Sequence, residues 1–558
     1  MNLAKLLIDH YEKSPLRPAI HFQIAGQPDE TITYKDLIHG VMGYVHAFRE
    51  NEVEPGDIVL IILQHSLDMA YAYFAAILYG AVPSIMPFLT EKLLAERYRA
   101  DLEALLEVTK PRVVVTYREF DHEVTAAIGS GNHEIRIIIA GDKVGSAPVD
   151  YSLLGGLHRS PSDVVLLQHS SGTTGLQKGV ALSHQAVINQ LDTYSEAIRL
   201  NDQDVIVSWL PLYHDMGLIA CWLLPIIKGI PLVWMSPFDW VKAPYRLFQA
   251  VSKYRGTLTW LPNFAFNFCA HKVRDRYLEG VDLSSWRSII NCSEPMRWES
   301  MNVFYERFVQ YGLKRNTLTT CYAMAENVFA VTQGKLDSPL IYEDVDREKL
   351  QSVKVAAISM DGNASVRMLG AGEAIKNTRV KIIDENGEKL SERHVGEILL
   401  QSDCMLTGYF NRPEITLTAF SEGWYKTGDF GYLVGKELFI TGRKKDLIIV
   451  GGKNIYPQDL ETLVYEVEGV HPGRASAFGV FNDDNGTEDV IIVAEVDNED
   501  VNERQKISDE IRSVVSRGSA VALRDVYIVG KHWLVKTSSG KVARSANRDK
   551  YLLEVNNK

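Results

Sequence analysis

Residues 58–87 read IVLIILQHSLDMAYAYFAAILYGAVPSIMP. The apolar run at 58–63 predicts a buried strand, residues 66–80 predict an apolar helix, and residues 81–87 predict the next strand. Strands that are apolar on both faces and joined by helices are typical of a parallel sheet covered by helices. Further apolar runs of this kind lie at 112–117, 136–141, 163–170, 205–211 and 231–237. The sequence therefore predicts a large α/β domain with helix-covered sheets.

The character of the chain changes after about residue 370. Short strands joined by Asx/Gly turns are predicted at 380–390, 395–402 and 435–442, which indicates a small β-rich subdomain within the large domain.

A charged, glycine-led segment at 442–446, GRKKD, is a predicted linker. Helices and strands of a small α+β domain are predicted beyond it, at 459–467, 476–481, 489–496, 502–516 and 524–530. We therefore expect an N-terminal domain at 1–442 and a C-terminal domain at 443–558.

The composition is that of an ordinary globular chain. Of 558 residues, 46% are hydrophobic and 23% are charged, which excludes collagen-like, disordered and disulfide-scaffold classes. Asp and Glu outnumber Lys and Arg by 71 to 59, a formal charge of −12. An acidic chain is a poor general binder of phosphate backbones, so we expect no nucleic acid partner. Local basic sites for small phosphorylated ligands are compatible with this charge.

Neither targeting nor membrane insertion is indicated. Charges follow the short apolar N-terminus at once, unlike in a signal peptide. The longest apolar stretch, 218–227, is interrupted by Pro225 and falls short of the roughly 20 residues that a spanning helix needs. We interpret it as a buried core helix and expect no membrane span. Five scattered cysteines without a CxxC pair indicate reduced thiols and a cytoplasmic location.

The strongest local signal is SSGTTGLQKG at 170–179, which directly follows a predicted strand. Small residues let backbone N–H groups approach an anion, hydroxyls add donors, and Lys178 adds a positive charge. The segment therefore has the composition of a phosphate-binding loop, although the spacing of a Walker loop is absent. A flexible surface turn is the alternative interpretation.

Two segments place a candidate functional residue beside a predicted strand. His214 in PLYHDMG lies between a strand end and an apolar helix, where it could gate a pocket or be an ordinary core residue. In TTCYAMAE, Tyr322 could stack on a base and Glu326 could hold a hard cation.

Two further segments have charged residues at predicted turns. Asp429 ends WYKTGD, where its carboxylate could accept hydrogen bonds from a ribose diol. KTSSGK, at 536–541, is a second Gly/Ser/Lys loop. A solvated charged turn is the alternative for both.

Together these segments resemble the motifs of the adenylate-forming superfamily, which comprises acyl-CoA synthetases, peptide-synthetase adenylation domains and luciferases. SSGTTGLQKG resembles the P-loop of that family, CYAMAE its adenine and magnesium motif, YKTGD its ribose motif, GRKKD its hinge and KTSSGK its catalytic-lysine motif. The resemblance covers nearly the whole chain and keeps the order of the motifs. It implies a large N-terminal domain and a small mobile C-terminal domain.

Finer matches are closest to fatty acyl-AMP ligases and their acyl-CoA ligase relatives. SWLPLYHDMGL, MSPFDWVKAP, LPNFAF, NCSEPMRWE, YPQDLE and TSSGKVARSANRDKYL resemble that group. So does the long segment 333–369, where an insertion in fatty acyl-AMP ligases is associated with hindering the CoA reaction. Gln177, Ala323 and Val535 depart from the usual family residues, and GGKNIYP is nearer to acyl-CoA synthetases.

The resemblance implies that a carboxylate reacts with ATP to give an acyl-adenylate and pyrophosphate, with Mg²⁺ as a further cofactor. The implied catalytic residues are Lys541, His214 and Glu326, and the metal residues are Glu326 and Thr173. The implied nucleotide-binding residues are Ser171, Gly172, Thr173, Thr174, Gly175, Lys178, Ser293, Glu294, Pro295, Tyr322, Ala323, Met324, Asp429 and Arg443.

An apolar slot is expected for the acyl chain, and Lys445 matches the hinge position of the family. The candidate walls of the slot are His214, Phe238, Trp260, Phe264, Phe266, Cys292 and Met324.

The acceptor of the acyl group has two candidates. A fatty acyl-AMP ligase would pass it to the phosphopantetheine thiol of an acyl carrier protein. An acyl-CoA ligase for medium- or long-chain acids would use free CoA. A non-catalytic acyl-nucleotide-binding relative is disfavoured by the intact motif residues Lys541, Glu326, Asp429 and Arg443.

Overall fold

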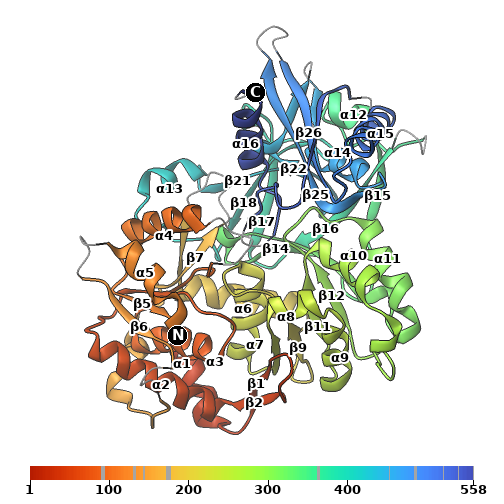
Figure 1. The fold of residues 1–558 in the computed structure, drawn as a ribbon. Helices are drawn as coiled ribbons and strands as arrows, with labels where there is room; N and C mark the ends of the chain where they lie inside the picture. The colour runs from red at the N-terminus through yellow and green to blue at the C-terminus, as the bar shows by residue number, and fades with distance from the viewer. Residues whose placement is uncertain are drawn as a thin grey trace.

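The computed structural model describes residues 1–89, 95–129, 134–141, 145–170, 178–360, 365–450, 453–482, 487–519, 521–537 and 540–556. Figure 1 shows a large lower body, coloured red to green, and a small blue body at the top that carries the C-terminus. Between them lie the green and cyan strands of a β-rich region. The α/β class and the small C-terminal domain agree with the sequence prediction.

The stretch 58–87 forms a strand, a helix and a strand, as predicted, and its strands lie at the centre of a seven-stranded sheet. Strand β3 (Ile58–Ile61), helix α3 (Leu67–Tyr79) and strand β4 (Val82–Ile85) follow one another, and β3 and β4 pair in parallel. The sheet order is β19-β8-β7-β4-β3-β5-β6, with antiparallel pairs only at the β8 end. Its strands are β3 (Ile58–Ile61), β4 (Val82–Ile85), β5 (Val113–Thr116), β6 (Arg136–Ile139), β7 (Val164–Ser170), β8 (Lys178–Ser183) and β19 (Gly408–Tyr409).

A second sheet of fifteen strands joins the rest of the large domain to the β-rich region. Its main path is β17-β18-β21-β22-β16-β14-β13-β12-β11-β9-β10-β1-β2, parallel from β13 to β1. Its strands are β1 (Pro18–Gln23), β2 (Glu30–Thr33), β9 (Ile206–Ser208), β10 (Leu232–Met235), β11 (Leu258–Leu261), β12 (Ser288–Asn291), β13 (Leu318–Ala323), β14 (Ala330–Gln333), β15 (Tyr342–Asp346), β16 (Ser365–Ala374), β17 (Thr378–Ile383), β18 (Gly396–Ser402), β20 (Phe420–Ser421), β21 (Trp424–Val434) and β22 (Glu437–Arg443).

Helices cover these sheets and close a continuous apolar core. In the large domain they are α1 (Leu3–Lys13), α2 (Tyr34–Glu50), α3 (Leu67–Tyr79), α4 (Ala95–Thr109), α5 (Asp121–Ile128), α6 (His184–Ala197), α7 (Leu224–Lys228), α8 (Pro237–Lys242), α9 (Tyr245–Tyr254), α10 (Asn263–Lys272), α11 (Trp298–Phe308), α12 (Arg347–Ser352) and α13 (Pro413–Ala419). In the described part of the chain, no helix is long and apolar enough to cross a membrane.

The apolar stretch at 218–227 is buried, as predicted, but most of it is a π-helix. The π-helix runs from Met216 to Leu223, and α7 continues it. A stretch that is apolar on every side has no amphipathic period, so the sequence could not distinguish the two helix types. Gly217 is the second residue of this helix. A β-carbon there would stand 2.1 Å from the carbonyl oxygen of Pro211, and this close approach requires glycine.

The C-terminal domain has an apolar core of its own, which includes Leu460, Ile492 and Val515. Its elements are β23 (Ile448–Val450), β24 (Lys453–Ile455), α14 (Pro457–Val464), β25 (Val470–Asn482), β26 (Thr487–Val496), α15 (Val501–Ser519), β27 (Leu523–Val529) and α16 (Arg544–Asn556). Helix α14 begins two residues before the prediction because Pro457 suits the first turn of a helix.

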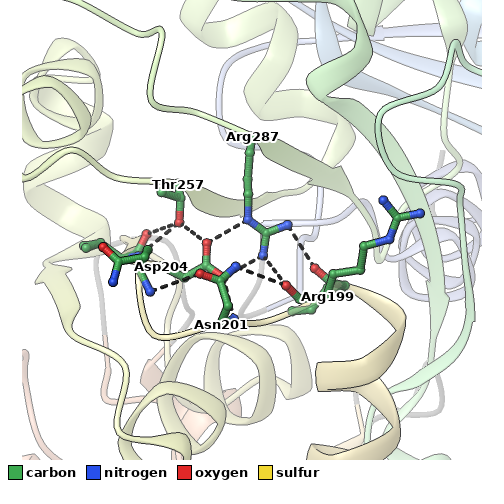
Figure 2. Close-up of polar contacts among 8 residues, drawn as sticks. Arg199, Asn201, Asp204, Thr257 and Arg287 are labelled. Carbon is green, nitrogen blue, oxygen red and sulfur yellow. Dashed lines mark hydrogen bonds and ion pairs between the residues drawn. The ribbon is translucent and has the colours of Figure 1, made fainter.

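A polar network ties together the amino ends of three central strands (Figure 2). Arg287 donates Nε and Nη2 to the two carboxylate oxygens of Asp204, at 2.7 and 2.6 Å. Thr257 Oγ1 and the backbone N–H of Asn201 also donate to Asp204, which is only 2% exposed. Asp204, Thr257 and Arg287 lie just before β9, β11 and β12. The carboxyl ends of the same strands are thereby left to form a site.

Candidate active site

The site begins at the carboxyl ends of the parallel strands β12 and β13. Ser293 follows β12 and adopts a φ of +72°, an unusual backbone conformation for a residue other than glycine. Such a conformation costs about 1–3 kcal/mol and persists only where the surroundings hold it. The Ser293 carbonyl oxygen accepts a hydrogen bond of 2.5 Å from Nζ of Lys541, so this backbone conformation coincides with an interdomain contact.

Lys541 comes from a tight loop of the C-terminal domain that directly precedes α16. The loop is closed by backbone bonds from Gly540 N–H to the Thr537 oxygen, 2.8 Å, and from Thr537 N–H to the Lys541 oxygen, 2.7 Å. Burial lowers the pKa of the Lys541 ammonium, and the charge of Glu294 opposes this shift. The loop thus inserts a single cation into the large domain.

Two half-buried acidic groups lie near this cation. Glu294 accepts a hydrogen bond from the backbone N–H of Phe264 at 2.9 Å, and Asp215 accepts one from Met216 N–H at 2.8 Å. Burial raises the pKa of both carboxyls, whereas the Lys541 ammonium lowers them. Sequence reasoning missed Asp215, although it stands in the quoted PLYHDMG segment.

His214 lies beside the same lysine as a neutral imidazole. Burial lowers its pKa to about 3, and the positive charge of Lys541 adds to this effect. Its buried Nε2 has no hydrogen-bond partner among the described residues. A buried nitrogen left unpaired by the protein is a reason to expect a ligand group there.

Glu326 is held at the end of β13 by two tyrosines. Tyr409 donates its hydroxyl to Glu326 Oε1 at 2.8 Å, and the hydroxyls of Tyr409 and Tyr425 are 3.0 Å apart. Lys178, at the start of β8, places Nζ 5.0 Å from the ring centroid of Tyr409. Burial raises the pKa of the Glu326 carboxyl, and the Tyr409 hydroxyl opposes this rise. Glu326 and Lys178, which are far apart in sequence, therefore lie around one aromatic ring.

The donor set around Glu326 fits Mg²⁺ in its usual mode. Among the described residues no three His, Cys, Asp or Glu side chains cluster as a preformed metal site. Mg²⁺ in phosphoryl-transfer enzymes rests on one or two carboxylates, with water and substrate phosphates completing its shell. A single half-buried carboxylate, Glu326, near Lys178 has that composition.

Tyr322, Asp429 and Arg443 form a second group. Tyr322 donates its hydroxyl to Asp429 Oδ2 at 2.6 Å, and Arg443 Nε lies 3.5 Å from Asp429 Oδ1. Asp429 and Arg443 face each other across the antiparallel pair β21–β22. The charge of Asp429 raises the pKa of Arg443. The structure thus brings together the three residues that sequence comparison linked to adenine and ribose.

The predicted acyl-pocket residues divide into two groups. Trp260, Phe266 and Cys292 are fully buried, and Trp260 donates Nε1 to the Tyr194 hydroxyl at 2.8 Å. Phe238 and Met324 are half-buried, and Phe264 is 40% exposed.

The sequence analysis did not predict two aromatic residues that lie beside Phe264. Trp209 and Trp240 stack with centroids 3.6 Å apart, and Phe264 approaches both rings edge-on at 6.2 Å. The backbone N–H of Phe264 binds Glu294, so this aromatic group adjoins the polar site.

Ser171, Gly172, Thr173, Thr174 and Gly175 lie outside the described residues. Pro295 and Ala323 stand beside Glu294 and Tyr322 at the strand ends. Lys445 lies in the short 3₁₀ segment Lys444–Asp446 between β22 and β23.

The fold and site define an ATP-dependent adenylate-forming enzyme, in which a small domain inserts a lysine above the carboxyl ends of a parallel sheet. Residues 8–410 match the family model described as AMP-binding enzyme, and the chain belongs to this family.

Several relatives are similar over nearly the full chain. The medium-chain-fatty-acid–[acyl-carrier-protein] ligase JamA of Moorena producens is 30% identical over 571 residues, 97% of this chain and 93% of the relative. The long-chain-fatty-acid–AMP ligase FadD32 of Mycolicibacterium smegmatis is 30% identical over 562 residues, 91% and 87% of the two chains. A putative acyl-CoA synthetase of Caulobacter vibrioides is 28% identical over 538 residues, 95% and 92%.

The similar solved structures also include fatty acyl-adenylate ligases. A chain from a study of fatty acyl-adenylate ligases from E. coli and L. pneumophila superposes with a TM-score of 0.90 at 28% identity, covering 99% of this chain and 97% of that one. A fatty acyl-adenylate ligase from L. pneumophila in complex with acyl adenylate and pyrophosphate gives 0.74 at 28% identity, with 99% and 96% coverage.

Proposed function

We propose that the protein activates a fatty acid, or a related carboxylic acid, with ATP and then transfers the acyl group to the phosphopantetheine thiol of an acyl carrier protein. The observation that carries this proposal is the Lys541 ammonium, which the C-terminal domain places on the Ser293 carbonyl among Glu294, Asp215 and His214.

In the first step a carboxylate oxygen attacks the α-phosphorus of ATP, the bond to the β-phosphate breaks, and pyrophosphate leaves. Both reactants are anions, so the site must hold them together and offset their charge. Lys541 is the cation available at the strand ends to act on the carboxylate and the α-phosphate. His214, neutral and with Nε2 unpaired, is positioned to orient the carboxylate without adding charge.

The nucleotide would lie along the strand ends. Tyr322 would pack against adenine, and Asp429 and Arg443 would bind the ribose hydroxyls. Lys178 and the preceding loop would hold the β- and γ-phosphates, with Thr173 beside the metal. Mg²⁺ would be held by Glu326 and would supply further charge neutralisation at the phosphates. Tyr409 keeps the Glu326 carboxylate in place for this role.

In the second step a thiol attacks the acyl carbonyl carbon of the acyl-adenylate. The bond between this carbon and the phosphate oxygen breaks, AMP leaves with the electron pair of that bond, and the thiol proton passes to water. We propose that residues 443–558 rotate for this step, with Lys445 as the pivot. Arg544 binds Asp446 at 2.9 Å and Glu461 at 2.6 Å. Asp446 is thereby fixed to the C-terminal domain, so the backbone change must occur before it.

The segment 333–369 supports a carrier protein as the acceptor. Arg367 anchors the segment to the large domain, because its guanidinium lies 4.8 Å from the ring centroid of Trp298 in α11. Within the segment, Arg367 binds Asp344 at 2.9 Å and lies over the ring of Tyr342. In the middle of the segment, Arg347 donates Nη1 to the carbonyl oxygen of Gly518 in α15. Figure 1 shows α12, which Arg347 begins, next to α14 and α15.

Apolar contacts strengthen this bridge. Val345 and Leu350 of the segment share a buried cluster with Tyr456 of the C-terminal domain and with Tyr432 and Phe439 of the β-rich region. The bridge coexists here with Lys541 in the site, and a rotation of the C-terminal domain would break it, so it would favour adenylation over rotation. A carrier protein could offset this bias with its own interface, whereas free CoA has little surface with which to do so.

One incubation tests the proposal. The protein, ATP and Mg²⁺ are mixed with a panel of acids, together with CoA or with a phosphopantetheinylated carrier protein, and the products are identified by mass. We expect acyl-AMP with fatty acids, an acylated carrier protein, and little acyl-CoA. Rapid acyl-CoA synthesis would instead establish the second candidate, an acyl-CoA ligase, which GGKNIYP at 451–457 favours.

All five cysteines are buried free thiols, and we propose the reducing cytoplasm as the location of the reaction.

A further inference from the structure

A cavity of about 500 Å³ lies outside the candidate active site, where the end of α8, the start of α9 and the end of α10 meet. Four exposed cationic side chains line it: Lys242, Lys272, Arg274 and Arg276. Within the described part of the chain, none of the four has a carboxylate partner within ion-pair distance. Among the described residues, the four side chains make a single hydrogen bond, from Arg276 Nη2 to the Tyr277 hydroxyl at 2.8 Å.

The acid nearest in sequence does not neutralise this cluster. Asp275 stands between the two arginines, but its carboxylate binds Arg307 Nη2 at 2.5 Å and the Tyr311 hydroxyl at 2.7 Å. Arg307 also donates to the carbonyl oxygen of Val273 at 3.1 Å. The loop that carries Arg274 and Arg276 is therefore fixed from the side of α11, and its own acid is already occupied.

A flat aromatic wall adjoins the cations. Tyr245 and Tyr277 stack with centroids 4.1 Å apart and planes 8° from parallel. The Arg276 guanidinium lies 4.7 Å from the Tyr277 ring centroid. Gln249 donates to the backbone oxygen of Tyr277 at 3.1 Å, which holds the ring pair in place. Such a wall can pack against the organic part of a ligand while the cations bind its charge.

Four unpaired cations around one hollow repel one another, and a chain of net charge −12 has ample acid with which to pair them. An anion in the cavity would turn this repulsion into attraction. The concave form favours a discrete anionic group over a flat charged surface. Lysine and arginine side chains are the usual partners of phosphate oxygens.

We propose that this cavity binds a phosphorylated ligand, with its phosphate among Lys242, Lys272, Arg274 and Arg276 and its organic part against Tyr245 and Tyr277. The ligand comes either from a soluble phosphate ester or from the headgroup of a phospholipid. The four cations are different residues from Lys178, Arg443 and Lys541, the cations of the candidate nucleotide site.

The probe for the test is glycerol 3-phosphate, which represents both sources, titrated calorimetrically into the full-length protein. The variant Lys272→Ala/Arg274→Ala should bind it about tenfold more weakly, because two of the four charges that act on one anion are gone. The control Lys35→Ala/Lys436→Ala, which removes two exposed lysines elsewhere, should bind like the wild type. Pyrophosphate release should be unchanged in both, which also shows that they fold. Lys272→Glu should also weaken the binding of glycerol 3-phosphate.

A second arm identifies the source. Sedimentation with vesicles of phosphatidylcholine and phosphatidylglycerol, but not of phosphatidylcholine alone, that depends on Lys272 and Arg274 would assign the site to a phospholipid headgroup. Binding of the probe without vesicle binding would assign it to a soluble ester.

Three results would overturn the proposal. The double variant could bind the probe as well as the wild type does, which would place the probe elsewhere. The wild-type protein could fail to bind both glycerol 3-phosphate and the vesicles. An acyl carrier protein alone could be retained through Lys272 and Arg274, in which case the cavity is part of a surface for an acidic protein and not a phosphate site.

Discussion

Replacing Arg347 by alanine should increase acyl-CoA formation while leaving pyrophosphate release unchanged. Arg347 connects the segment 333–369 to the C-terminal domain through the Gly518 carbonyl oxygen, and its Nη2 donates to Ser365 O at 3.1 Å. A hydrogen bond from a charged donor contributes about 1.5–3 kcal/mol. Because Arg347 is only half-buried, we use the lower end of this range. About 1.4 kcal/mol corresponds to a tenfold change in an equilibrium constant, so the rotated arrangement should be about ten times more populated in Arg347→Ala.

The assay follows the two half-reactions separately. Pyrophosphate release reports adenylation, and mass detection of the thioester reports transfer to CoA or to a carrier protein. Lys349→Ala is the matched control, since Lys349 lies on the same helix, α12, and its side chain is exposed. We expect the CoA thioester rate of Arg347→Ala to rise up to tenfold, with the control unchanged.

Equal CoA thioester rates in Arg347→Ala and Lys349→Ala would refute the argument, because the bridge would then not oppose rotation. A parallel fall of pyrophosphate release in Arg347→Ala would mean that the bridge supports the adenylating site itself and does not select the acceptor.

Four further outcomes are expected. Lys541→Ala should lower acyl-AMP formation by roughly 10²–10³, the usual effect of removing one donor to a developing charge, with ATP binding retained in a filter assay. Glu326→Ala should shift the Mg²⁺ dependence of pyrophosphate release to higher concentration; an unchanged titration would exclude a metal role. Lys445→Pro should keep adenylation and impair thioester formation, because proline fixes φ near −65°; equal losses in both steps would place the pivot elsewhere. Asp204→Ala should destabilise the large domain by about 3 kcal/mol in urea unfolding by leaving Arg287 unpaired, whereas Asp202→Ala, at an exposed position, should not.

Much of the fold could be predicted because the strands are short runs of apolar residues. The runs at 58–63, 112–117 and 136–141 form β3, β5 and β6, each two residues shorter than predicted. Strand β25 is much longer than predicted, because its first half, from Val470, mixes proline, glycine and charge. Such residues weaken the alternating pattern from which a strand is read.

The site could be predicted only where its residues lie within short motifs. Tyr409 escaped prediction because it is 83 residues from Glu326, and Arg347 lies 171 residues from Gly518. Asp215 was visible in the sequence, but nothing in the sequence placed it beside Lys541. Contacts of this kind arise when a long crossover or a separate domain folds back, and local periodicity contains no information about them.

The network of Arg287, Asp204 and Thr257 has a consequence for how this enzyme can change (Figure 2). These residues hold β9, β11 and β12 at their amino ends, whereas His214, Phe264 and Ser293 follow the carboxyl ends of the same strands. Rigidity and chemistry are thus located at opposite edges of one sheet. Because most substitutions in a pocket lower stability, a strong anchor at the far edge leaves more tolerance for changes near the substrate. Libraries that vary the acyl specificity should therefore leave Asp204 and Arg287 intact, and variants weakened there should accept far fewer pocket substitutions.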